Sequence, residues 1–280
     1  MGQIGETIVF VKGGEKVSTE QCESRVNPLS LLAPNEASQI KHVLAVISGK
    51  GGVGKSVVSA LIAIGLTRQG YRVGILDADI TGPSIPKMFG LHTSPAGVDN
   101  FIMPVETSLG IKVMSLNLLL SREDDPVIWR GPLISGAVKQ FWTDVIWGEI
   151  DYLIIDLPPG TGDVPLTVMQ SLPLNGLVVV TSPQDLASMV VRKAVRMAGQ
   201  MNVPVLGLVE NMSYLVCPHC AEKIYLFGSS HVREITWSEG IELIDSLPVD
   251  PRLAELCDRG RIEAYQTEVF QELFKKLNEG

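Results

Sequence analysis

One stretch of the sequence has the residue types and spacing of a loop that binds phosphate groups. It follows the pattern G-x-x-x-x-G-K-[S/T] and consists of Gly49, Lys50, Gly51, Gly52, Val53, Gly54, Lys55 and Ser56. In such a loop the glycines let backbone N–H groups turn toward phosphate oxygens, and the positive end of the following helix adds to the attraction. We expect Lys55 to reach the β- and γ-phosphates of a nucleotide and the hydroxyl of Ser56 to bind Mg²⁺.

Carboxylates follow two of the apolar runs that we expect to form strands. Asp156 comes directly after Tyr152–Ile155, and Asp79 follows shortly after Val73–Leu76. The carboxyl ends of parallel strands converge on one ligand crevice, so both side chains are expected beside the phosphate loop. Mg²⁺ prefers oxygen ligands. We therefore predict a magnesium site formed by Ser56, Asp79 and Asp156, directly or through water.

The four cysteines do not make the framework of a disulfide-rich protein. Cys22 and Cys257 are isolated, whereas Cys217 and Cys220 form a C-x-x-C pair. In a reducing compartment such a pair indicates metal or redox chemistry. A tetrahedral metal site or a [4Fe–4S] cluster takes four ligands. Because a twofold axis between two chains brings two such pairs together, the pair predicts a metal site shared by a homodimer.

Three chemistries are compatible with the Cys217/Cys220 pair. A [4Fe–4S] cluster and a zinc ion both accept four thiolates, and His219 or His231 is available to join a zinc site. A redox dithiol of the thioredoxin kind would open a helix after a strand. The residues between these cysteines are instead expected in a loop just beyond Asn211, which disfavours the dithiol.

Short β-branched runs alternate with helical stretches from residue 42 onward, and this alternation predicts the elements that position the loop and the carboxylates. Most of the runs are almost continuously apolar, as strands covered on both faces are. The pattern predicts an α/β fold with a doubly wound, mostly parallel sheet. The expected strands are Val43–Ser48, Val73–Leu76, Ile111–Ser115, Tyr152–Ile155, Leu177–Thr181, Val205–Val209 and Glu242–Leu247. The expected helices are Ser56–Gln69, Leu133–Ile146, Leu186–Met201, His231–Trp237 and Ile262–Leu277.

The chain divides into a short arm and one domain. Residues 1–41 are expected to form an N-terminal arm, in which Thr7–Val11 and Lys16–Thr19 make a weak hairpin. Residues 42–280 are expected to form a single P-loop ATPase domain. The terminal helix, Ile262–Leu277, has one apolar face. Because its polar face is acidic, we expect it to pack on the domain rather than on a membrane surface.

Composition excludes several classes of protein. The chain has 280 residues, of which 45% are hydrophobic and 19% charged, so it is neither disordered nor fibrous. Its net charge of −8 opposes binding to nucleic acid. The longest nearly apolar run, Val57–Leu66, is about half of what a bilayer span requires. The first residues lack the features of a signal peptide, so we expect a cytoplasmic protein without stable membrane association.

The early lysine of the loop, Lys50, narrows the class of nucleotide-binding protein. A K-G-G-x-G-K-S loop resembles that of the deviant Walker A ATPases, which include MinD, ParA and the nitrogenase iron protein. Together with the motifs that follow, the chain resembles the Mrp/ApbC family of iron–sulfur cluster carriers over about residues 42–280. Those motifs are DADITGPSIP at 77–86, WRGP at 129–132, DLPPGTGD at 156–163, VENMS at 209–213 and CPHC at 217–220.

This resemblance implies an ATP-hydrolysing homodimer that holds a labile [4Fe–4S] cluster and transfers it to apo-proteins. It implies that Lys50 reaches the partner's nucleotide, that Asp79 orients the attacking water and that Asp156 begins the segment sensing the γ-phosphate. It further implies that Asn211 recognises adenine and that Pro248 lies in a base-contacting loop. The residues expected to act in hydrolysis are Lys50, Lys55, Asp79 and Asp156, and the cluster would bridge Cys217 and Cys220 of both chains.

The chain departs from the family pattern at Val190, where many members have an acid, and the role of that acid is not carried over. Its arm also lacks the four-cysteine motif of some eukaryotic relatives. Two alternatives share the ATPase class. A MinD/ParA-like dimerisation switch on membrane or DNA is opposed by the acidic charge, and an electron donor like the nitrogenase iron protein is opposed by the absence of cysteine from residues 156–163.

Overall fold

The central strand of the sheet leads directly into the phosphate loop. The computed structural model describes residues 31–79, 82, 84–98, 101–119, 131–184, 187–228, 230 and 232–279. Its main sheet contains β1 (Gln39–Ser48), β2 (Val73–Asp77), β5 (Val105–Glu106), β6 (Lys112–Ser115), β7 (Glu149–Asp156), β8 (Gly176–Thr181), β9 (Val205–Val216), β10 (Lys223–Ile224) and β11 (Leu243–Pro248). The strand order is β10-β9-β8-β1-β7-β2-β6-β5, and β11 pairs with β9 beside β10. Strands β3 (Ala96–Val98) and β4 (Phe101–Met103) form a separate hairpin.

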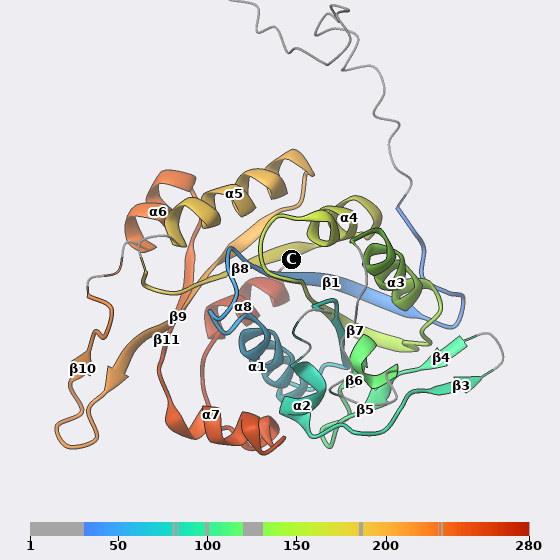
Figure 1. Cartoon of the computed structure of the whole chain (residues 1–280), viewed down its shortest axis with the longest axis horizontal. Helices are drawn as coiled ribbons and strands as arrows, with labels where there is room; N and C mark the ends of the chain where they lie inside the picture. Colours follow the sequence, from blue (N-terminus) through green and yellow to red (C-terminus); the bar gives the residue numbers. More distant parts are fainter. Residues whose placement is uncertain are drawn as a thin grey trace, which may run out of the picture.

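Helices cover both faces of this sheet (Figure 1). One face packs against α3 (Gly131–Thr143), α4 (Asp163–Ser171), α5 (Ala187–Gln200) and α6 (Val232–Glu239). The other packs against α1 (Lys55–Arg68), α2 (Ile85–Phe89), α7 (Pro251–Asp258) and α8 (Gln271–Glu279). Short 3-10 turns lie at Leu116–Leu119 and Ile262–Ala264. In the described part of the chain, none of these helices is long and apolar enough to cross a membrane.

All strand pairs are parallel except those of β5 and β10 in the main sheet, which confirms the predicted doubly wound α/β fold. The register determines which strand ends meet. Val46 of β1 lies opposite Asp156 of β7, and Asp77 of β2 also lies opposite Asp156. The carboxylates predicted from two separate runs are therefore brought together beside the end of β1.

The first strand begins earlier than predicted. β1 starts at Gln39 rather than Val43, and the residues before it contact the domain. The amide of Asn35 donates hydrogen bonds to the carbonyls of Thr143 (3.1 Å) and Val145 (2.6 Å). The hairpin predicted at Thr7–Val11 and Lys16–Thr19 lies outside the described residues, so an arm over residues 1–41 stays a prediction.

Strand β9 continues well beyond the predicted end at Val209 and reaches Val216. Pairing explains the extension, because β10 joins its end in an antiparallel hairpin and Pro248 of β11 pairs with Tyr214. Asn211 therefore lies inside a strand and not at its end, and Cys217 follows the strand directly.

The terminal segment is not one continuous helix, so the predicted helix Ile262–Leu277 is wrong over its middle. A 3-10 turn at Ile262–Ala264 is followed by a loop, and α8 begins only at Gln271. Phe270 adopts a left-handed conformation with φ 67°, and its N–H donates to the carboxylate of Asp245 (3.0 Å). Its side chain and those of Leu273 and Phe274 are buried, as the prediction that this segment packs on the domain requires.

Candidate functional site

The glycines of the phosphate loop allow neighbouring side chains to approach its backbone more closely than any other residue type would permit. Gly54 precedes α1 and has a left-handed conformation with φ 78°. A Cβ built at Gly54 would collide with the amide nitrogen of Asn211, and one at Gly49 would collide with Val190 of α5. The loop is therefore packed between β9 and α5, and Val190, the departure from the family pattern, contacts it directly.

Lys55 is a buried cation surrounded by carboxylates. Its Nζ lies 2.9 Å from Oδ2 of Asp156 and 3.5 Å from Oδ2 of Asp79. Burial alone would lower the pKa of Lys55, but the carboxylates of Asp156 and Asp79 outweigh it and raise that pKa above its usual value. The ammonium group therefore stays charged at the base of the loop, where it is able to bind phosphate.

Ser56 and Asp156 lie within hydrogen-bond distance of each other at the start of α1. The Ser56 hydroxyl donates to Oδ2 of Asp156 (2.6 Å) and its Oγ accepts from Nζ of Lys55 (3.3 Å), which leaves one lone pair of Oγ for a metal ion. The hydroxyl of Ser59, one turn along α1, donates to Oδ1 of the same carboxylate (2.6 Å). The hard oxygen donors of Ser56, Asp156 and Asp79 suit Mg²⁺, so the residues present fit this ion.

Asp77 is a buried carboxylate to which the sequence analysis assigned no role. Its oxygens accept hydrogen bonds from the Ser115 hydroxyl (3.0 Å) and the N–H of Asp79 (3.1 Å). Burial and the charge of Asp156 raise the pKa of Asp77 well above its usual value. Asp77 thus holds the backbone of Asp79 in place at the end of β2.

A cavity of about 390 Å³ lies over the loop. Lys50 borders it, and the Lys50 ammonium group donates a hydrogen bond to the side-chain carbonyl of Gln184, in the segment between β8 and α5. The cavity is lined by Ser48, Lys50, Gly51, Gly52, Gly54, Lys55, Ser56, Val57, Asp79, Gly82, Ser84, Met88 and Pro159. Most of the residues predicted to bind phosphate and Mg²⁺ therefore face one volume, while Asp156 lies behind it.

The two residues predicted to contact the base do not line this cavity. The amide of Asn211 donates to the backbone carbonyl of Val53 (2.9 Å) and so supports the loop from β9. Pro248 lies at the end of β11, opposite Tyr214. Sequence reasoning missed the contacts of Asn211 and Ser59 with the loop region, since neither is signalled by a spacing in the chain.

The cysteine pair lies at the turn of the β9–β10 hairpin. Two backbone hydrogen bonds close the turn, from the N–H of Cys217 to the carbonyl of Glu222 and from the N–H of Ala221 to the carbonyl of Cys217 (2.9 Å each). Cys217 is half-buried and Cys220 is exposed. Hydrogen bonds from the N–H groups of Cys220 and His219 lower the pKa of the Cys217 thiol and so favour the thiolate, the form that binds metals.

The hairpin offers two thiolates rather than a complete metal site. Across the described ranges of this chain, no group of three or more His, Cys, Asp or Glu side chains is arranged to hold a metal ion. His219 therefore does not complete a three-ligand site with Cys217 and Cys220, and His231 lies outside the described residues.

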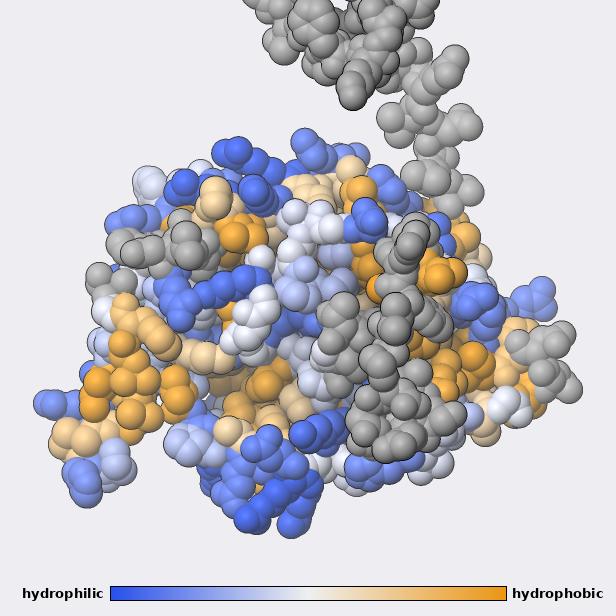
Figure 2. All heavy atoms as spheres, in the orientation of Figure 1, coloured by the Kyte–Doolittle hydropathy of each residue, from blue (hydrophilic) through white to orange (hydrophobic). Residues whose placement is uncertain are grey.

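Exposed apolar side chains lie next to the cysteine turn. Figure 2 shows hydrophobic surface gathered over β10 and the segment that follows it. The exposed side chains there are Val216, Ile224, Tyr225, Leu226 and Phe227, each between 44% and 54% exposed. Such a contiguous apolar patch is typical of a surface that contacts another protein.

Comparisons with known proteins agree with this geometry. Residues 39–279 match the family model of the NUBPL iron-transfer P-loop NTPase, within the ParA group. An iron–sulfur cluster carrier protein of Clostridium perfringens is 49% identical over 82% of this chain and 83% of its own length. One of Methanocaldococcus jannaschii is 44% identical over 86% of each chain.

Solved structures show the same fold. A nucleotide-binding protein from Archaeoglobus fulgidus, in complex with ADP, is 50% identical and covers 83% of this chain and 91% of its own, with a TM-score of 0.75. MinD of Aquifex aeolicus, at 17% identity, covers 85% of this chain and 98% of its own with a TM-score of 0.59, which is a likeness of fold alone.

Replacement of Gly54 by alanine should weaken nucleotide binding. The new Cβ would collide with Asn211 and would hold an L-residue at φ 78°, so the loop must shift. We expect the affinity for ADP, measured by calorimetry, to fall at least about tenfold, or about 1.4 kcal/mol. Gly70→Ala is the matched control, since Gly70 has φ 94° with open space around it, beyond the end of α1. An unchanged affinity in Gly54→Ala would show that the loop tolerates the collision.

The thiol of Cys217 should titrate below its ordinary range in the folded chain. We expect Cys217, studied in a chain carrying Cys22→Ser, Cys220→Ser and Cys257→Ser, to react with iodoacetamide with a midpoint at lower pH than in urea. The reason is that the N–H groups of residues 219 and 220 remain in the folded state and stabilise the thiolate. Identical midpoints with and without urea would contradict the proposed N–H···S contacts.

Proposed function

The chain belongs to the NUBPL iron-transfer P-loop NTPase family, and from this premise we propose that it is a nucleotide-hydrolysing carrier that delivers iron–sulfur clusters to apo-proteins. One observation carries the proposal. Strand β9 contacts the phosphate loop through Asn211 and ends at the Cys217 turn, where backbone N–H groups favour a metal-binding thiolate. The same strand thus contacts the phosphate loop and leads into the thiolate pair.

The residues of the loop support binding and hydrolysis of ATP. Backbone N–H groups of residues 51–56 and the Lys55 ammonium group would hold the phosphates, and Ser56, Asp79 and Asp156 would hold Mg²⁺. When bound, this ion neutralises charge on the phosphate oxygens. Asp79, at the cavity wall, would orient a water that attacks the γ-phosphorus, so that the bond to the β-phosphate oxygen breaks and ADP and phosphate form.

A homodimer would complete both sites. The two thiolates of one chain supply half of the four ligands that a [4Fe–4S] cluster takes, and a second copy would supply the other half. The apolar patch around the hairpin offers contact surface for that copy or for an acceptor. The same dimer would let Lys50 leave Gln184 for the partner's nucleotide and act there as an added cation. We place this carrier in the cytoplasm.

Metal and sulfide analysis tests the proposed cargo. Anaerobic reconstitution should give about four iron and four sulfide per dimer, because four cysteines ligate one cluster. Cys217→Ala/Cys220→Ala should bind no cluster and transfer none to an apo-acceptor. Cys257→Ala should bind a full cluster, since burial raises the pKa of Cys257 to about 11 and keeps it a thiol within α7. Zinc in place of iron and sulfide, or a cluster retained without the pair, would refute the proposed cargo site.

Substitution of the two loop lysines should separate binding from hydrolysis. Lys55→Ala should lose affinity for ATP. Lys50→Ala should still bind ADP, yet its phosphate release should fall by roughly 10³-fold, as expected when a cation supplied in trans is removed. Sedimentation velocity should show that ATP no longer drives its dimerisation. Lys41→Ala, near the other end of β1, is the matched control and should behave as the parent. If Lys50→Ala hydrolyses ATP at the rate of the parent, Lys50 has no role in the reaction.

A further inference from the structure

Two consecutive residues of β9 face opposite sides of the sheet. Asn211 contacts the phosphate loop through the carbonyl of Val53, on the side of α1. Glu210 points to the other side, toward α6, as neighbouring residues of a strand do. Glu210 is only 2% exposed, and neither the proposed hydrolysis nor the proposed cargo site uses it.

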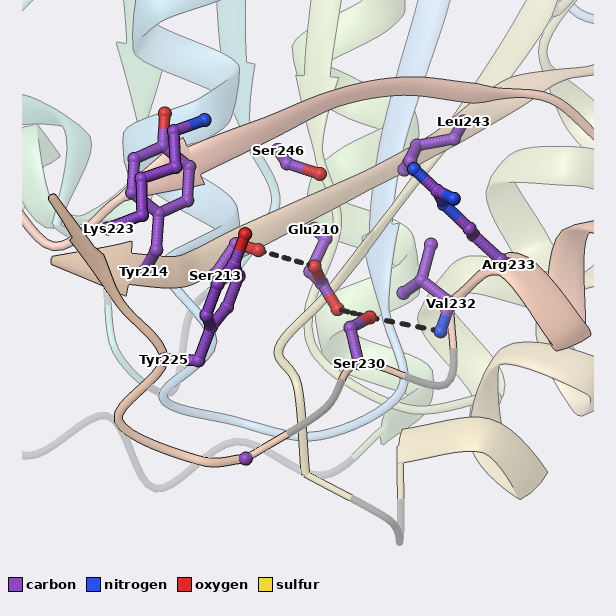
Figure 3. A pocket seen from close by; sticks show the side chains of 11 residues that line it. Glu210, Ser213, Tyr214, Lys223, Tyr225, Ser230, Val232, Arg233, Leu243 and Ser246 are labelled. Carbon is purple, nitrogen blue, oxygen red and sulfur yellow. Dashed lines mark hydrogen bonds between the residues drawn. The ribbon is translucent and has the colours of Figure 1, made fainter.

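Glu210 binds the segments that lead into and out of the cysteine hairpin. Its carboxylate accepts a hydrogen bond from the hydroxyl of Ser213 (2.6 Å), on the strand that leads to Cys217. It also accepts one from the hydroxyl of Ser230, on the segment that returns from β10. The Ser230 hydroxyl in turn accepts from the N–H of Val232 (3.1 Å) at the start of α6. Figure 3 shows this chain of contacts across the floor of a cavity.

The backbone between the two sites is held in an uncommon conformation. Met212 has φ 58°, the left-handed region that residues other than glycine seldom adopt. A regular strand would direct residues 210 and 213 to opposite faces. The left-handed residue between them lets both Glu210 and Ser213 line the same cavity. Asn211, directly before the bend, contacts the loop, so a shift of residues 210–213 would displace groups on both sides of the sheet.

The hairpin is joined to the body of the domain by the pairing of Tyr214 with β11, where the N–H of Val249 donates to the carbonyl of Tyr214 (2.7 Å). A cavity of about 640 Å³ lies between the hairpin, β11 and α6, and Lys223, Tyr225 and Arg233 border it. Within the hairpin, Nζ of Lys223 lies 4.0 Å from the centre of the Tyr214 ring. On the side of the cavity, the hydrogen bonds of Glu210 join the strand that enters the hairpin to the segment that leaves it.

We propose that Glu210 is the positioning residue that couples the nucleotide loop to the cysteine pair. The inference rests on the proposed function for the reason why the two sites are coupled. The contacts that couple them do not depend on that function. Binding of nucleotide displaces the loop at Val53, Asn211 moves with it, and Glu210 transmits this displacement through Ser213 and Ser230 to the hairpin. The exposure of Cys217 and Cys220 then depends on whether nucleotide is bound.

The test measures how fast a maleimide modifies the cysteine pair in metal-free, reduced, full-length chain carrying Cys22→Ser and Cys257→Ser. The rate is measured with and without ADP and Mg²⁺, and the affinity for ADP is measured separately. We expect nucleotide to change the rate at least about fivefold in this parent, the lower range of ordinary coupling between sites. Glu210→Gln and Ser230→Ala should bind ADP, yet nucleotide should no longer change their rate.

Ser246→Ala is the matched control, because Ser246 lines the same cavity from β11 and belongs to neither the hairpin nor its return segment. It should keep the nucleotide effect of the parent. If Glu210→Gln does not fold, Ser230→Ala decides, since it removes a single hydroxyl. The proposal is overturned if nucleotide has no effect in the parent, or if the variants keep the parent's effect. Loss of ADP binding in both variants also overturns it. No cluster is needed, so the result is independent of the cargo analysis.

Discussion

The buried ion pair between Lys55 and Asp156 is the interaction on which the site depends. Burying two charges costs several kcal/mol unless hydrogen bonds and the opposite charge compensate them. Here the hydroxyls of Ser56 and Ser59 satisfy both carboxylate oxygens, and the ammonium group lies 2.9 Å away. These groups meet only if β1 and β7 pair in the observed register, with α1 directly after the loop. The strand pairing that defines the fold therefore also brings the residues of the site together.

Strand β9 connects the nucleotide site to the cysteines. One side of it supports the phosphate loop through Asn211, and its far end carries the Cys217 turn. The left-handed Met212 lies between these two points, where a backbone conformation of higher energy is retained. The proposed carrier requires its cargo site to respond to nucleotide. A continuous strand, bent at Met212, connects the phosphate loop directly to the cysteine turn and would transmit such a response.

The sequence predicted the loop, the carboxylates and the parallel sheet because their signals are local. Glycine spacing, an acid after an apolar run and a β-branched run are each readable within about ten residues. The extension of β9 to Val216 was missed because it depends on pairing with β10 and β11. The terminal helix was predicted too long because apolar residues recur at helical spacing from Tyr265 to Leu277, whereas the break follows from the left-handed Phe270 and its bond to Asp245. The contacts of Glu210 and Asn211 join residues 20 and 158 positions apart, beyond the reach of any spacing.

The most direct test of a shared element between the two sites is the affinity for ADP in the presence of Mg²⁺, compared anaerobically between cluster-loaded and cluster-free protein. Coupling between binding sites is reciprocal, so a nucleotide that alters the cysteine pair must itself be bound differently when the pair holds a cluster. We predict dissociation constants that differ at least about fivefold. Equal constants would contradict the coupling and would leave β9 as a structural strand that happens to carry both sites.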